Sequence, residues 1–170
     1  MTPLPTEGDF EIVSLNVSMI TGVRKTPVGA FVLAPGLGVE GDAHAGLVED
    51  RQVSLLAVEE IEEASAVLQA RKASGQAGGC ARASLDSLKP GDFAENVTTR
   101  GLALHELPVG TRVEIGGALL EVSKIGKECH TACEIRRLVG DCVMPRKGIF
   151  MRVLRGGEVR REDRGHYRIR

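Results

Sequence analysis

The sequence predicts a mainly β protein with a few helices, in which an antiparallel sheet closes into a β-barrel. Several short apolar runs alternate with polar residues or stop at glycine and proline, which is typical of short strands joined by close turns. The 21 glycines are spread along the 170 residues and punctuate these runs. Helical segments are too few to alternate with the strands as in a doubly wound α/β fold, so the pattern favours a barrel.

The first half of the chain is expected to contain four strands and one helix. Residues 10–17 alternate apolar and polar side chains with the period of a half-buried strand. Around Ile61, Ala64 and Leu68 the period becomes helical, and glutamates cluster near the start of this segment, where acidic groups suit the helix dipole. The other expected strands are residues 29–34, 52–57 and 93–99.

The second half is expected to contain two hairpins and a further helix. The first hairpin joins residues 112–115 to residues 118–125 through two glycines, a two-residue turn. The helix is expected at residues 129–139, where Cys129, Cys133, Arg136 and Arg137 recur at helical spacing. The last hairpin is expected to join residues 148–154 to residues 158–160, again through two glycines.

Length and charge favour a single globular domain at residues 10–165, preceded by a flexible N-terminus at residues 1–9. The 22 basic and 23 acidic residues leave a net charge of −1, so no overall field favours nucleic acid or a membrane surface as a partner. Residues 1–9 lack the apolar core of a signal peptide, and no apolar run approaches the roughly 20 residues that span a bilayer. We expect a cytoplasmic protein with reduced cysteines.

The segment Gly126–Cys133 is the strongest indication of chemistry. It places Cys129 beside a turn glycine and a lysine, at the predicted start of a helix. The helix dipole and the cation both favour the thiolate, which is the form that attacks electrophiles or binds soft metals. Cys129 and Cys133 are four residues apart, so they would share one face of that helix.

The other cysteines have alternative interpretations. Cys80 is expected to be an inert buried residue, whereas Cys133 and Cys142 are equally compatible with the core and with the site. The spacing is not that of a Cys-x-x-Cys redox pair. A zinc site formed by Cys129, Cys133, Cys142 and a histidine is the remaining alternative.

A glycine-rich loop at residues 36–46 carries Asp42 and His44. Its backbone N–H groups could approach an anion while Asp42 or His44 handles a proton or a hydroxyl group. The loop lacks the spacing of a dinucleotide fingerprint or a P-loop. A purely structural glycine turn is therefore the alternative interpretation.

Other polar residues also allow two interpretations. Asn96 could bind a polar ligand or bond its own backbone in a turn. Seven arginines lie in the last nineteen residues, either as a solvated basic tail or as an anion site on the last strand. His105 and His166 lie in polar surroundings and are expected at the surface.

Several segments, in order, resemble the MOSC domain, the module found at the C-terminus of molybdenum cofactor sulfurases and in free-standing bacterial proteins. The resemblance covers about residues 10 to 160 and is to the free-standing bacterial type. It implies a closed barrel of the PK β-barrel kind with a few helices. The matching segments are residues 38–46, 51–56, 91–99, 107–115, 120–129 and 148–159.

The resemblance implies a site for the molybdenum–molybdopterin cofactor, which is expected to be labile. Cys129 matches the family's functional cysteine, which ligates molybdenum held by a pterin dithiolene or accepts sulfur for the cofactor. Soft sulfur ligands suit this metal, and a basic rim suits the pterin phosphate. The residues expected to form that rim are Arg51, Asn96, Lys127 and Arg152.

Three functions are compatible with this resemblance. The first is a carrier that binds molybdenum cofactor or its precursor during maturation, insertion or sulfuration. The second is a molybdenum-dependent reductase of N-hydroxylated compounds, although the chain lacks the extra N-terminal β-domain and the ferredoxin domain of reductase members. The third is a cofactor-free sulfur carrier with a persulfide on Cys129, resolved by Cys133 or Cys142.

The sequence also departs from its relatives. Glu128 stands where many hydroxylaminopurine-resistance and amidoxime-reducing members have a proline before the cysteine. The chain has no pyridoxal-phosphate domain, so we expect a separate cysteine desulfurase or a molybdoenzyme as its protein partner.

Overall fold

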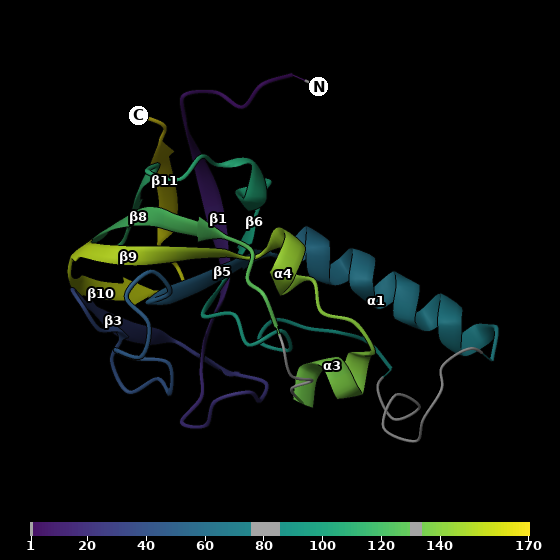
Figure 1. Cartoon of the computed structure of the whole chain (residues 1–170). Coiled ribbons are helices and arrows are strands. Elements are labelled where there is room, and N and C mark those ends of the chain that lie inside the picture. Colours follow the sequence, from purple (N-terminus) through teal and green to yellow (C-terminus); the bar gives the residue numbers. More distant parts are fainter. Residues whose placement is uncertain (1, 76–85, 130–133) are drawn as a thin grey trace.

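The computed structural model describes residues 2–75, 86–129 and 134–170 (Figure 1). Within them, seven strands form one sheet in the order β11-β7-β8-β9-β5-β6-β1, and β1 pairs with β11 to close the ring. The predicted closed barrel is therefore confirmed. Its strands are β1 (Glu7–Val17), β5 (Val53–Ala57), β6 (Val97–Arg100), β7 (Arg112–Ile115), β8 (Ala118–Ile125), β9 (Ile149–Arg155) and β11 (Arg164–Arg168).

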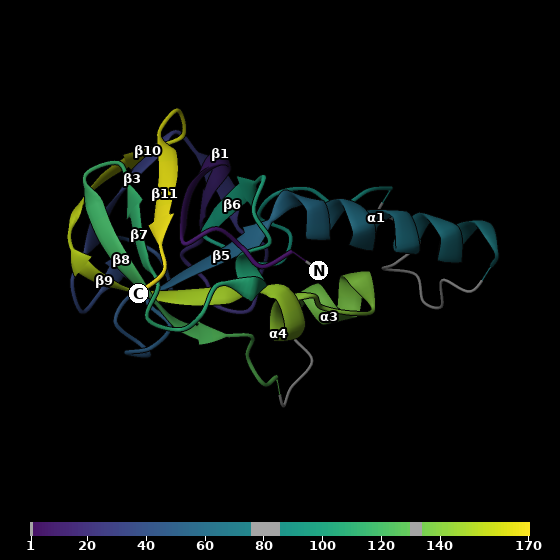
Figure 2. The ribbon, with the colours of Figure 1, turned by 90° about the horizontal axis from the view of Figure 1, so that it is seen from above.

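The remaining elements lie around this ring. β2 (Thr26–Val28) pairs with β1 outside the barrel. A separate three-stranded sheet contains β10 (Gly157–Arg160), β3 (Ala30–Ala34) and β4 (Gly38–Val39). The helices lie together on one side of the barrel (Figures 1 and 2). They are α1 (Val58–Ala73), α3 (Glu134–Val139) and α4 (Met144–Lys147), and a short 3-10 helix covers Leu104–Glu106.

Two hydrophobic clusters hold the fold together. Inside the barrel, strands such as β8 alternate, with Leu120 and Val122 completely buried and Glu121 turned outward. β5 differs because all five of its residues are buried. One of its faces lines the barrel, and Leu56 on the other face joins a second cluster beneath the helices. That cluster also contains Ile61, Leu68, Phe93, Ile135, Met144 and Phe150.

Most local predictions are confirmed, including the strand expected at residues 29–34, the one at 52–57, the hairpin at 112–125 and the helix α1. One pairing in the ring departs from the antiparallel rule. β5 and β6 are parallel, with Leu55 opposite Val97, because α1 carries the chain back before β6 begins. Parallel neighbours require such a crossover connection.

The predicted hairpin between residues 148–154 and 158–160 is wrong. β9 pairs with β8 along one edge and with β5 along the other, so both of its edges are occupied. After Gly156 the chain therefore leaves the ring, and β10 pairs with β3. The strand expected at residues 93–99 is also shorter, and begins only at Val97.

The first and last strands of the described barrel differ from the expected strands. β1 begins at Glu7, three residues before the predicted strand, because residues 7–11 pair with β11. β11 ends at Arg168 and was not among the predicted strands. In the part of the chain that the structure describes, no helix is long and apolar enough to cross a membrane.

Gly126 ends β8 and turns the chain toward Cys129. Its φ is +69°, and its N–H donates to the carbonyl of Gly148 at 2.7 Å. A Cβ at this position would collide with the carbonyl oxygen of Pro145. Only glycine therefore fits both the backbone conformation and the space.

We predict that Gly126→Ala lowers the free energy of unfolding by about 2–4 kcal/mol, measured by urea denaturation, because it adds left-handed strain to a backbone collision. Gly101→Ala is the matched control. Gly101 has a φ of +88° but open space around its Cβ position, so we expect a loss of only about 1 kcal/mol. Equal losses in the two variants would contradict the proposed collision.

Candidate functional site

Cys129 lies three residues beyond Gly126, in an irregular segment that is partly exposed. Cys129 itself is not helical, and the described part of the helix expected at residues 129–139 is α3, at Glu134–Val139. Cys80 and Cys133 lie outside the described residues, and so does the expected shared face of Cys129 and Cys133.

A wide hollow of about 780 Å³ surrounds Cys129, and we call it the Cys129 hollow. Cys142, which is buried, lines it as well, so the structure brings these two cysteines to one site. Basic side chains outnumber acidic ones around the thiol. The charged residues lining the hollow are Lys124, Lys127, Glu128, Arg136, Asp141 and Arg146.

A second cavity of about 190 Å³ adjoins this hollow, and we call it the Arg51 cavity. Four residues predicted from the sequence line it together: His44, Arg51, Asn96 and Lys127. Lys127 lines both spaces. The rest of the lining is apolar except for Ser54, and its apolar residues are Leu47, Val48, Phe93, Ala94, Met144 and Phe150.

Asp42 lines neither space but anchors the loop that does. Both its oxygens accept hydrogen bonds from Lys25 Nζ, at 2.9 and 2.8 Å, and both partners are almost completely buried. The carboxylate also accepts the N–H groups of Ser18 and His44. Burial opposes ionisation of Asp42, but the contacts with His44, Lys25 and Ser18 outweigh it and hold the pKa of the carboxyl well below its usual range.

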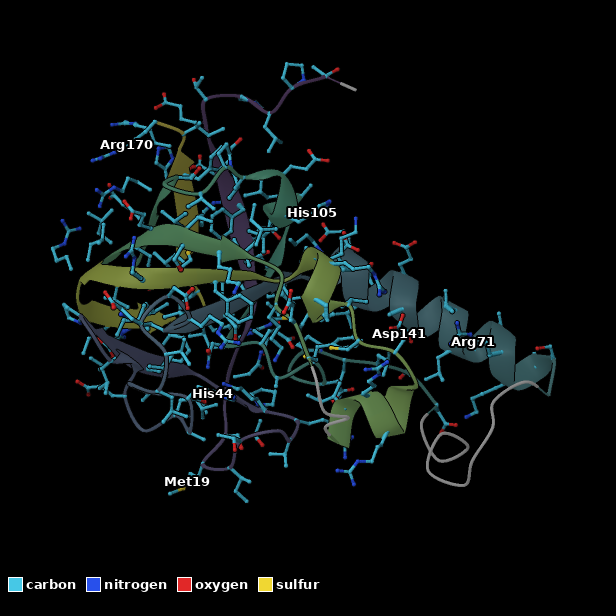
Figure 3. The ribbon with its side chains drawn as sticks, in the orientation of Figure 1. Met19, His44, Arg71, His105, Asp141 and Arg170 are labelled. Atoms are coloured by element: carbon cyan, nitrogen blue, oxygen red, sulfur yellow. The ribbon has the colours of Figure 1, made fainter. Side chains whose placement is uncertain are left out.

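His44 lines the Arg51 cavity, and its backbone N–H donates a hydrogen bond to the Asp42 carboxylate. Its Nδ1 lies 3.4 Å from Asp42 Oδ2, which makes an ion pair only when the imidazole is protonated. About a third of the side chain is exposed, so the ring can meet a ligand or solvent. Figure 3 shows His44 at the lower end of the barrel, on the same side as the loop of Met19.

Asn96 is held within the scaffold. Its side-chain oxygen accepts the N–H and the hydroxyl of Ser54, and its amide donates to the carbonyl of Asn16. These bonds link β5, β6 and β1 on the wall of the Arg51 cavity. The side chain of Asn96 is therefore already used in cross-strand hydrogen bonds, and a contact with a ligand would add to them.

Sequence reasoning missed Lys25 as part of the site and did not expect Glu95 to be buried. Burial raises the pKa of the Glu95 carboxyl, although Gly91, Thr98 and Phe93 all donate hydrogen bonds to it. Lys25 lies between Arg24 and Thr26, and no local pattern distinguishes it from a surface lysine.

The two arginines predicted for the rim lie in different surroundings. The Nε of Arg51 is buried and has no hydrogen-bond partner among the described residues, and the nearest acid, Asp50, is 3.9 Å away. Arg152 lies on β9 and binds Glu121 at 3.1 Å. Arg152 lines neither of the two spaces near Cys129.

The described residues contain no group of three or more histidine, cysteine or acidic side chains that could hold a metal ion. Cys129 and Cys142 are the thiols at the site within the described ranges.

We predict that Asp42→Asn destabilises the protein by about 3–5 kcal/mol at neutral pH, because it leaves the Lys25 ammonium buried without a countercharge. The pKa of Asp42 in the folded state is below the value of about 4 in an unfolded chain. Its stabilisation is therefore complete above that value and is lost as the pH falls below about 4 toward the lowered pKa. The variant should show a shallower acid-side loss in urea denaturation.

Asp86→Asn is the control for this variant. Asp86 is fully exposed and makes a surface ion pair with Lys72 at 3.4 Å, so its loss should change stability little. An Asp42→Asn protein as stable as Asp86→Asn would contradict the role of the buried pair.

The comparisons with known proteins agree with this architecture. Residues 40–164 match the model of the MOSC domain family. The structure is similar to that of YuaD from Bacillus subtilis, with a TM-score of 0.72 and 18% identity over 96% of this chain and 98% of YuaD. No curated protein sequence matches significantly.

Two structures of YiiM are also similar. The Escherichia coli protein has a TM-score of 0.65 and 20% identity, covering 96% of this chain and 71% of YiiM. The Geobacillus stearothermophilus protein has a TM-score of 0.61 and 22% identity, covering 91% and 72%. At these identities the likeness establishes the fold alone, whereas the family model spans more than half of the chain. The chain belongs to the MOSC domain family.

Proposed function

We propose that this MOSC protein binds molybdenum cofactor or its precursor and holds it for maturation, insertion or sulfuration, with Cys129 as the molybdenum ligand or the sulfur acceptor. One observation carries the proposal. A partly exposed thiol stands in a predominantly basic hollow that shares Lys127 with a smaller cavity lined by His44 and Arg51. This arrangement matches a ligand with a soft metal at one end and a phosphate at the other.

The donor set favours a metal that arrives inside a cofactor. Cys129 supplies one sulfur, and the described part of the chain offers no cluster of hard or nitrogen ligands beside it. A pterin dithiolene would bring further sulfur ligands, which a soft metal accepts. When bound, the group would supply the redox and sulfur chemistry of molybdenum.

The basic residues would orient the anionic end of the cofactor. The buried Nε of Arg51 has no hydrogen-bond partner among the described residues, so it can donate to a phosphate oxygen without breaking a hydrogen bond within that part of the chain. Lys127 is shared by the two spaces and can reach a charge in either. Arg152 lines neither space and binds Glu121 on the barrel wall, so we do not include it in this proposed rim.

A sulfur-carrier function is the second candidate, and the position of Cys142 favours it. Cys142 lines the same hollow as Cys129, although it is buried. A Cys142 thiolate attacking the inner sulfur of a Cys129 persulfide would form a disulfide between the two cysteines and release hydrosulfide, which balances atoms and electrons. A separate sulfurtransferase, such as a cysteine desulfurase, would have to load Cys129.

We predict that protein purified from a host that makes molybdenum cofactor contains molybdenum and pterin in nearly equal amounts, and that Cys129→Ala removes the molybdenum. Lys127→Gln and Arg51→Gln should each weaken cofactor binding about tenfold or more, since each removes a charge-assisted contact. Metal analysis and pterin fluorescence measure both effects.

Arg152→Gln is the matched control, because it removes the same charge from outside the two spaces and should retain the cofactor. Molybdenum absent from the wild type as well as from Cys129→Ala would overturn the ligand assignment. A mass increase of one sulfur atom on Cys129 in that metal-free protein would then support the sulfur carrier.

A further inference from the structure

The last strand of the barrel presents its charged side chains on the outer surface between two neighbours. β11 pairs with β1 on one side and with β7 on the other. Tyr167 is buried, so the alternating residues Arg164, His166 and Arg168 point outward. The arginine-rich end of the chain therefore includes one face of an ordered strand. The interpretation of this end as a solvated tail does not fit β11.

On the β1 side, each outward group of β11 has an acidic partner across the ladder. The register places an acidic residue of β1 directly opposite each of these basic residues of β11, so opposite charges face each other across the two strands. The pairs are Arg168 Nε with Glu7 at 3.1 Å, His166 Nδ1 with Asp9 at 2.7 Å and Arg164 Nη1 with Glu11 at 3.9 Å.

On the β7 side the pairing is mixed, because Glu114 stands opposite His166 but two arginines face each other beside that pair. Arg112 is the register partner of Arg168, and like charges directly opposite each other on a ladder repel. Glu121 binds Arg112 at 3.2 Å, but the same carboxylate also binds Arg152. The buried Nε of Arg112 has no hydrogen-bond partner within the described residues. The two facing guanidinium groups thus each bind one acid on their outer sides, Glu7 for Arg168 and Glu121 for Arg112, and Arg112 keeps an unused buried donor.

A cavity of about 230 Å³ lies at this position, and we call it the β7–β11 cavity. A water molecule takes about 30 Å³ in the liquid, so the cavity has room for a group the size of phosphate. Arg170 also lines it and makes no hydrogen bond or ion pair with the rest of the described chain. Its lining residues are Arg112, Glu114, Leu119, His166, Arg168 and Arg170.

This cavity is separate from the site around Cys129. None of its lining residues lines the Cys129 hollow or the Arg51 cavity. Figure 3 shows Arg170 and His44 at opposite ends of the barrel. A ligand here would therefore bind independently of the cofactor.

We propose that the β7–β11 cavity binds an oxyanion of the phosphate class, carried by a small molecule or free in solution. Arg112, Arg168 and Arg170 donate hydrogen bonds to its oxygens, and the anion removes the repulsion between the first two. Three guanidinium groups against the single carboxylate of Glu114 make the lining cationic. Arginine forks match the oxygen geometry of a phosphate group.

The test is a titration of the full ¹⁵N-labelled chain with inorganic phosphate at constant ionic strength. The arginine Nε–Hε signals in the NMR spectrum monitor the binding. We expect a saturable shift of the Arg112 signal. Arg170→Gln and Arg168→Gln should each weaken phosphate binding about tenfold. Arg170→Gln removes no described contact, so it tests the site without disturbing the fold.

Two controls give the result its specificity. Arg164→Gln removes the same charge from the same strand but lies outside the cavity, and Lys127→Gln alters only the Cys129 site. Both should bind phosphate within about twofold of the wild type, since neither removes a proposed contact. The proposal is overturned if chloride causes the same shift of the Arg112 signal, if Arg164→Gln weakens binding as much as Arg170→Gln, or if only Lys127→Gln abolishes binding.

Discussion

The buried ion pair between Lys25 and Asp42 is the constraint on which the candidate site depends. The side chain of Lys25 holds Asp42, which in turn holds the N–H of His44 on the glycine-rich loop. The backbone N–H of Lys25 donates to the carbonyl of Gly91, at the turn that leads to Asn96. His44 and Asn96 stand on different walls of the Arg51 cavity, so one lysine links both walls.

This arrangement separates the rigid and the reactive parts of the site. The buried side chain of Asn96 is engaged in hydrogen bonds across strands, and that of Glu95 is engaged in hydrogen bonds within the turn before β6. Within the described residues, the Nε of Arg51 and the Nδ1 of His44 are buried without a hydrogen-bond partner beside the Arg51 cavity, and the free thiol of Cys129 borders the Cys129 hollow. A scaffold that satisfies its own buried groups can hold such side chains ready for a ligand, which lowers the entropy lost on binding.

The sequence predicted the features that depend on neighbouring residues. The hairpin at residues 112–125 follows from alternation and a two-residue glycine turn, and Cys129 stood out as a thiol close to a lysine. The partner of β10 could not be predicted, because it depends on which edges of β9 are already occupied. Lys25 gave no signal, since its ion pair forms only when two loops meet. The resemblance to the family, and no rule about residue spacing, led to Arg51, Asn96, Lys127 and Arg152, of which the first three line the Arg51 cavity.

The central claim is that the sulfur of Cys129 occupies the metal position of a cofactor site. Molybdenum X-ray absorption spectroscopy on the loaded protein and on Cys129→Ser tests it most directly, because the substitution keeps the shape of the side chain and replaces the sulfur. We predict that the wild-type spectrum requires one more sulfur neighbour of molybdenum than the Cys129→Ser spectrum. Identical sulfur coordination in the two proteins, with the metal retained in both, would contradict the account.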